Sequence, residues 1–97
     1  MASFGQREVR CAAGSPTHAI RTLWTNVPMD FVVEVEPPDA TGTWVERRSI
    51  LPAGIGMNDR SNGPVAAQMT FRRRYLDSSY EVEVTTDRPA TLRIRRA

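Results

Sequence analysis

The sequence predicts an all-β domain, a single antiparallel β-sandwich of about six to eight short strands with jelly-roll or immunoglobulin-like topology. Seven Pro and six Gly interrupt the 97 residues at short intervals, which leaves no segment long enough for a substantial helix. Between these interruptions, apolar and polar residues alternate, as they do in half-buried strands. A chain of this length has room for one hydrophobic core, so residues 1–97 are predicted to form one domain.

The first two segments after the N-terminal arm (residues 1–6) differ in clarity. Residues 7–12 are predicted to form a strand in which Cys11 is a buried thiol beside small apolar residues. Residues 16–24 fit two structures. Ser15 followed by Pro16 is typical of a helix N-terminus, and apolar residues follow at helical spacing, but an alternating pattern is present as well. We predict a strand here, with one short helix near 16–24 as the alternative.

Residues 30–36 alternate clearly, with valine and phenylalanine on one face and glutamate on the other. Residues 43–51 are predicted to form the next strand, but their pattern is less regular. Trp44 and Ile50 share a parity that Val45 does not, which is typical of an exposed aromatic residue, a bulge or a twisted edge. The sequence does not choose among these three.

The region around residues 54–63 is predicted to be polar loop. Its Asn, Asp and Ser residues resemble the ligands of a calcium loop, but Arg60 stands where an acidic ligand is expected, which favours a tight turn. Residues 65–75 are predicted to form a strand that places Arg73 on the apolar face. An inward arginine needs a partner, so the strand either ends near Arg72 or lies near a sheet edge.

The last two strands, residues 80–85 and 91–95, are predicted to pair as a hairpin around a turn at residues 87–89. Apolar residues of both segments would then face the same core, and glutamates would oppose arginines on the other face. The opposed pairs in this register are Val84–Leu92, Val82–Ile94, Glu83–Arg93 and Glu81–Arg95. The residues that define the predicted core are Phe31, Val33, Val35, Val82, Val84, Leu92 and Ile94.

All 13 basic residues are arginine, and 11 acidic residues nearly balance them, so the net charge is only +2. A protein that binds phosphates electrostatically would show a larger excess or a basic stripe. The arginines cluster at 47–48, at 72–74 and at 93–96. We predict that they neutralise glutamates on neighbouring strands, with a guanidinium cluster for nucleic acid as a disfavoured alternative.

Candidate catalytic and metal-binding residues are few. His18 is the only histidine and lies in a turn-like stretch, where a solvated or capping role is predicted. One cysteine and one histidine are too few for a usual zinc site. The paired glutamates 34/36 and 81/83 are predicted to lie on hydrated strand faces. The sequence therefore predicts no enzyme, no cofactor and no metal.

The predicted function is a structural or interaction subunit that docks on other protein chains of a larger assembly. A virion accessory, decoration or tail protein is an example of such a subunit. In one version of this hypothesis, the subunit also forms a homo-oligomer. A module that stacks glycans or small ligands on Trp24, Trp44, Tyr75 or Tyr80 is the first alternative, and a small-barrel nucleic-acid binder is the second. No signal peptide or membrane segment is expected, so synthesis in the cytoplasm is predicted. The predicted contact residues are Phe4, Arg7, an exposed Trp44, Ile55, Met57 and Arg60.

Overall fold

The structure, a computed structural model, describes residues 6–22, 27–50, 57–75 and 77–97. The described part of the chain forms eight strands, which confirms the predicted all-β class. The strands are β1 (Arg7–Cys11), β2 (Thr17–Thr22), β3 (Met29–Glu36), β4 (Gly42–Ile50), β5 (Met57–Pro64), β6 (Gln68–Arg73), β7 (Asp77–Thr86) and β8 (Ala90–Arg96). No helix in the described residues is long and apolar enough to cross a membrane.

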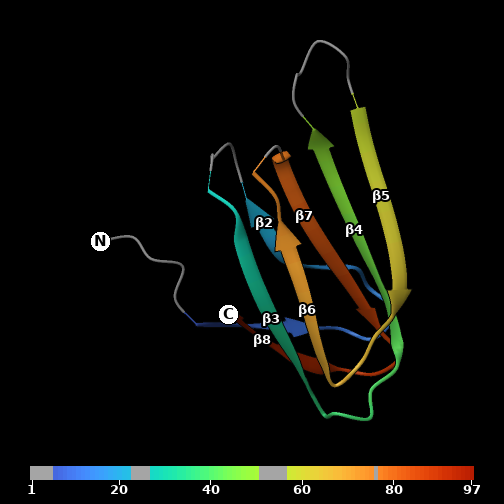
Figure 1. Ribbon diagram of the computed structural model, residues 1–97. Helices are drawn as coiled ribbons and strands as arrows, with labels where there is room; N and C mark the ends of the chain where they lie inside the picture. Colours follow the sequence, from blue (N-terminus) through green and yellow to red (C-terminus); the bar gives the residue numbers. More distant parts are fainter. Residues whose placement is uncertain (1–5, 23–26, 51–56, 76) are drawn as a thin grey trace.

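The strands form two packed antiparallel sheets (Figure 1). The first sheet has the order β1-β8-β3-β6, and the second sheet has the order β2-β7-β4-β5. The pairs are nested: β1 pairs with β8, β2 with β7, β3 with β6 and β4 with β5. This is the arrangement of one long hairpin rolled into a sandwich, the jelly roll. The nested order therefore selects the jelly roll over the immunoglobulin-like alternative, which keeps its first two strands in one sheet.

The core between the sheets contains every residue that alternation assigned to it. All seven predicted core residues are at most 3 % exposed. Cys11, Ile20, Phe71 and Tyr80 join them, so Cys11 is buried as predicted, and burial raises the pKa of its thiol. Each large apolar side chain that is fully buried stabilises the fold by about 1.5–3 kcal/mol.

The predicted hairpin between residues 80–85 and 91–95 is wrong. These segments belong to β7 and β8, which lie in different sheets, and none of the four predicted opposed pairs forms. Alternation identifies the side of a strand that faces the core, but two such sides can meet across a sandwich as well as side by side. The connection is fixed instead to the β3–β4 loop, where the Asp87 N–H donates to the Thr41 carbonyl and the Thr41 N–H donates to the Asp87 carboxylate, both at 2.9 Å.

The segment that fitted both helix and strand forms a strand from residue 17 to residue 22. Its pairing with β7 contains a bulge between His18 and Ile20. The bulge explains why Ala19 and Ile20, although consecutive, are both buried. Residues 23 and 24, which completed the helical pattern, lie outside the described residues.

The polar turn predicted around residues 54–63 is also wrong over its described part, because Met57–Pro64 forms strand β5. This strand pairs with β4 along its whole length, from the pair Ile50–Met57 to the pair Thr43–Pro64. Asn, Asp and Gly have low strand propensity, but the continuous ladder with β4 outweighs that local preference. Residues 54–56, the other part of the predicted loop, lie outside the described residues.

The structure explains the irregular alternation of residues 43–51 and the position of Trp44 within it. The pairing of β4 with β7 contains a bulge at Ser49–Ile50, as one of the three predicted options required. Trp44 is not the exposed aromatic residue that was predicted. It is partly buried and packs edge-on against Phe71, with the ring centroids 5.2 Å apart. A side chain at Gly63 would collide with this ring, because a Cβ there would lie 2.7 Å from Trp44 Cζ2.

Candidate functional site

Strand β5 is open to solvent on three sides. In the part of the chain that the structure describes, it is the edge of the second sheet and pairs only with β4 (Figure 1). Successive side chains of a strand point to opposite faces, and the five side chains from Asn58 to Asn62 are all exposed. Neither face of this part of β5 is therefore covered by the first sheet, and its outer backbone edge pairs with no strand of the described residues.

The register shows which backbone groups point to that free edge. Just beyond β5, the Val65 N–H donates to the Gly42 carbonyl at 3.0 Å. In an antiparallel ladder, hydrogen-bonded and non-hydrogen-bonded pairs alternate, so Gly63, Ser61 and Asp59 bond to β4. The residues whose N–H and C=O groups point outward are therefore Asn58, Arg60, Asn62 and Pro64. Proline has no N–H, so an outward position on an edge strand is where it is tolerated.

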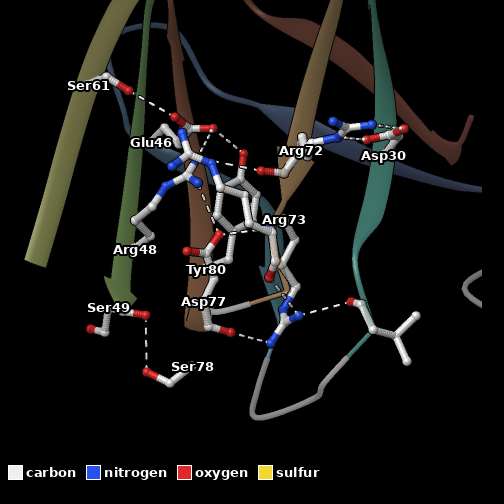
Figure 2. A network of polar contacts seen from close by, with 12 residues as sticks. Asp30, Glu46, Arg48, Ser49, Ser61, Arg72, Arg73, Asp77, Ser78 and Tyr80 are labelled. Atoms are coloured by element: carbon white, nitrogen blue, oxygen red, sulfur yellow. Dashed lines mark hydrogen bonds and ion pairs between the residues drawn. The ribbon is translucent and has the colours of Figure 1, made fainter. Parts of the chain in front are cut away.

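A buried polar network anchors the strands next to β5 (Figure 2). At its centre, Arg48 of β4 is only 7 % exposed. Its Nη1 donates to Asp77 Oδ2 at 3.0 Å, and its Nη2 lies 3.1 Å from Glu46 Oε2. The same guanidinium lies over the Tyr80 ring, 5.1 Å from its centroid. Arg48 therefore joins β4 to β7 by charge and by a cation–π contact.

Glu46 connects this network to β5. Its carboxylate accepts hydrogen bonds from the Tyr80 hydroxyl and from the Ser61 hydroxyl, the latter at 2.8 Å. Burial opposes ionisation of Glu46, but these hydrogen bonds and the Arg48 charge outweigh it, so its pKa is lowered. Burial and the Glu46 carboxylate raise the pKa of Tyr80. At neutral pH the pair is therefore a carboxylate and a neutral phenol.

Arg73 extends the network into the first sheet. Its buried guanidinium donates to the carbonyls of Val27 at 2.9 Å, of Arg74 at 3.2 Å and of Asp77. The sequence required that the strand end near Arg72 or lie near a sheet edge. Both hold, because β6 ends at Arg73 and is an edge strand. Asp77 also accepts the Arg74 N–H at 2.8 Å. The network thus ties β4, β5 and β7 to β6.

The groups of this network bind one another, and the geometry gives them an anchoring role. Sequence reasoning placed Arg48 in a cluster that neutralises glutamates on neighbouring strands, but it did not predict that Arg48 is buried or that it contacts Asp77 and Tyr80. The available signal was the alternation Trp44, Glu46, Arg48, which puts two opposite charges on the same face as a large aromatic ring.

On the outer face of the second sheet, His18 meets two glutamates. His18 was predicted in a turn, but it lies on β2, and its Nε2 is 2.9 Å from Glu81 Oε2 and 3.3 Å from Glu83 Oε2. The other oxygen of Glu83 pairs with Arg47 Nη1 at 2.5 Å. The hydrogen bond from Arg47 is the main reason that the pKa of Glu83 is lowered.

Arginines pair with acidic residues on neighbouring strands, as predicted, but the specific pairs predicted for β8 do not form. Arg93 meets Glu8 across β1 and β8 instead of Glu83. The observed ion pairs are Arg47–Glu83, Arg48–Glu46, Arg48–Asp77, Arg72–Asp30, Arg88–Asp39, Arg88–Asp87 and Arg93–Glu8. Acidic and basic residues are mixed on the outer face of the first sheet, where Glu8 opposes Arg93 and Asp30 opposes Arg72. This face therefore forms no basic stripe within the described residues.

The structure gathers only part of the predicted contact set. Met57 and Arg60 lie on β5, and Arg60 is exposed with its backbone directed to the free edge. Arg7 is exposed on β1, at the edge of the first sheet, and its guanidinium donates to the Ala19 carbonyl. Phe4 and Ile55 lie outside the described residues.

The aromatic residues proposed for ligand stacking do not form a platform where they are described. Tyr80 is buried, Trp44 packs on Phe71, and Tyr75 alone is strongly exposed. Trp24 lies outside the described residues. The described aromatic residues thus offer no exposed pair of rings.

Comparisons with known proteins add no name or activity to this geometry. No family model, no curated protein and no solved structure matches the chain. The function is therefore inferred from the exposed strand and the network that supports it.

The lowered pKa of Glu46 predicts a loss of stability in acid. A carboxyl whose pKa falls on folding stabilises the native state above its ordinary pKa of 4.5, and this contribution is lost as the pH falls through the folded value. The Glu46→Gln variant should be about 1–3 kcal/mol less stable near neutral pH. The difference from the wild type should shrink below about pH 4.5. Urea unfolding over a pH series measures this, and a constant difference would contradict the assigned role.

Proposed function

We propose that this protein is a non-enzymatic interaction subunit that docks on other protein chains of a larger assembly through β5. The observation that carries the proposal is that residues 58–62 of β5 expose side chains on both faces and a backbone edge that no other described strand pairs with. An extended segment of a partner would pair with this edge by main-chain hydrogen bonds, the mode known as β-strand addition.

The energetics of β5 support this role. Fixing the backbone of a residue costs about 1–2 kcal/mol, and the side chains from Asn58 to Asn62 are all polar and exposed, so they add no apolar core packing that would offset it. The strand is held by its ladder with β4 and by polar contacts such as Ser49 Oγ to Asn58 Oδ1 at 2.9 Å. The buried network fixes the other side of β4. A partner strand would therefore meet a prearranged edge and would lose less free energy to ordering.

The partner to which we commit is β5 of a second copy, related by a two-fold axis. The outward-facing backbone groups of the two copies meet when Ser61 lies opposite its own copy. Arg60 of each chain then faces Asn62 of the other, and Asp59 faces Gly63. Registers centred on Asp59 or Arg60 would oppose like charges, which destabilises a strand pair.

A subunit of this kind fits the accessory, decoration or tail layer of a virus particle. Jelly rolls are common in viral capsid proteins, and they also occur in lectins and cupins. The fold therefore supports this finer proposal by analogy alone, and the free edge of β5 supports the more general one.

The Asn62→Pro variant tests the proposal. Proline removes an outward N–H from the free edge without removing a hydrogen bond to β4. We expect the wild type to form dimers in sedimentation equilibrium at concentrations up to about 1 mM, which detects association free energies as weak as about 4 kcal/mol. Asn62→Pro should be monomeric with a similar melting temperature. The matched control, Asn62→Ala, keeps the N–H and should still dimerise. A monomeric wild type, or a dimer that persists in Asn62→Pro, would overturn the proposal.

A further inference from the structure

We propose that the outer face of β2 and β7 binds a divalent first-row transition metal ion through His18, Glu81 and Glu83. The site offers one imidazole nitrogen and two carboxylate oxygens, and the three ligand atoms all lie within 4.8 Å of one another. This ligand set goes beyond the docking role of β5, because it lies on the opposite half of the second sheet.

The spacing of the ligand atoms fits a common ion. Metal–nitrogen and metal–oxygen bonds of about 2.0–2.2 Å place neighbouring ligand atoms about 3–3.5 Å apart in octahedral or tetrahedral geometry. His18 Nε2 lies 2.9 Å from Glu81 Oε2 and 3.3 Å from Glu83 Oε2. An ion can thus enter between them after small side-chain rotations, without movement of the backbone.

The bulge in β2 creates this arrangement. It lets Ala19 and Ile20 both enter the core, while His18 points outward opposite Glu83. Glu81 and Glu83 are two residues apart on β7, so their side chains share the same face. Bulges often re-aim a side chain next to a functional site. The three ligands are thereby held on two paired strands, which position them better than loops do.

The surroundings of the site define which ions it would accept. Arg47 holds Oε1 of Glu83, which leaves Oε2 to the ion and orients the carboxylate as outer partners of metal ligands do. Arg21 of β2 lies opposite Glu81, and Arg60 of β5 also acts on Glu83. These positive charges disfavour ions held by charge alone, such as Ca²⁺ and Mg²⁺. Ions that bind imidazole well, such as Zn²⁺ and Co²⁺, are favoured.

The site is also open. The side chains of His18 and Glu81 are 47% and 32% exposed, so water or a group from another molecule can complete the coordination. Three protein ligands with open positions is the pattern of a site that can exchange its remaining ligands.

Titration of the full chain with Zn²⁺ at about pH 7, followed by isothermal calorimetry, tests the proposal. We expect one saturable site per chain. His18→Ala and Glu81→Gln should each weaken binding at least about 10-fold. The matched control Glu34→Gln removes an exposed acid from the first sheet and should bind as the wild type does. Two ligand variants are used so that a folding defect in one does not decide the result.

Absorption spectra with Co²⁺ give a second readout. Nitrogen and oxygen ligation should produce weak d–d bands that disappear in His18→Ala, whereas a thiolate charge-transfer band would assign the ion to Cys11 and overturn the proposal. No saturable Zn²⁺ binding, or binding that both ligand variants retain, would also overturn it. Asn62→Pro should bind Zn²⁺ normally, so a failure of the metal site and a failure of β5 docking are distinguishable.

Discussion

Replacing Arg48 with methionine is expected to lower the free energy of unfolding by about 3–5 kcal/mol. Methionine keeps much of the apolar volume over Tyr80 but removes the charge that faces two carboxylates. Asp77, which is only 2 % exposed, would then lose its ion-pair partner on β4. Total stabilities of small domains are about 5–15 kcal/mol. The variant should therefore show a large loss in urea unfolding.

Two further variants isolate the cause of this loss. Arg72→Met breaks the exposed Arg72–Asp30 pair on the neighbouring strands and should cost no more than about 1 kcal/mol. Arg48→Met combined with Asp77→Asn should recover part of the stability, because the carboxyl group that lost Arg48 is replaced by an amide while the Arg74 N–H keeps an acceptor. If Arg48→Met were as mild as Arg72→Met, the network would not have the anchoring role assigned to it.

Replacing Gly42 with alanine is expected to cost at least about 3 kcal/mol. Gly42 has a φ of 149°, and an added Cβ would lie 1.9 Å from the Thr85 carbonyl oxygen. The obstructing atom belongs to the backbone of β7, so no side-chain rotation can relieve the collision. Relief requires β4 and β7 to separate where their pairing begins.

Gly14 provides the comparison for this variant. It also has a positive φ, of 75°, but no atom lies within 4 Å of the Cβ that alanine would add. Gly14→Ala should therefore cost only the conformational penalty of about 1–2 kcal/mol. Melting curves of the two variants measure the difference, and equal losses would mean that the contact with Thr85 is not what requires glycine at position 42.

Alternation in the sequence was sufficient to identify seven residues of the core. Phe31, Val33 and Val35 lie on one face of β3, and Val82 and Val84 do the same on β7. Burial of one face follows from local chemistry, because a pleated strand sends alternate side chains to opposite sides. The class of fold and most strands could be predicted for this reason.

Connectivity could not be predicted in the same way. Short separation in sequence favoured a hairpin between β7 and β8, but residues 87–89 carry the chain from one sheet to the other. The choice depends on contacts with distant segments, such as that of Asp87 with Thr41. No local pattern in either strand contains that information.

The candidate site was the least predictable part. Met57–Pro64 has the composition of a loop, and only its pairing with β4 makes it a strand. His18 likewise gains its neighbours through a bulge in the pairing with β7. Both features arise from tertiary structure that overrides local preference. Arg60 was nevertheless selected as a contact residue, on the general tendency of arginine to lie in interfaces.

The nested strand order has a consequence for how the protein is made. Among the eight described strands, β4 and β5 are the only consecutive pair that are neighbours in one sheet. Every other pairing must join distant segments, up to Arg7 with Ile94. Folds dominated by such contacts form slowly, in about milliseconds to seconds. On the ribosome, β1 and β3 cannot pair with β8 until residues 90–96 have been synthesised, whereas the β4–β5 hairpin, the one pairing of consecutive strands within the described residues, can form earlier.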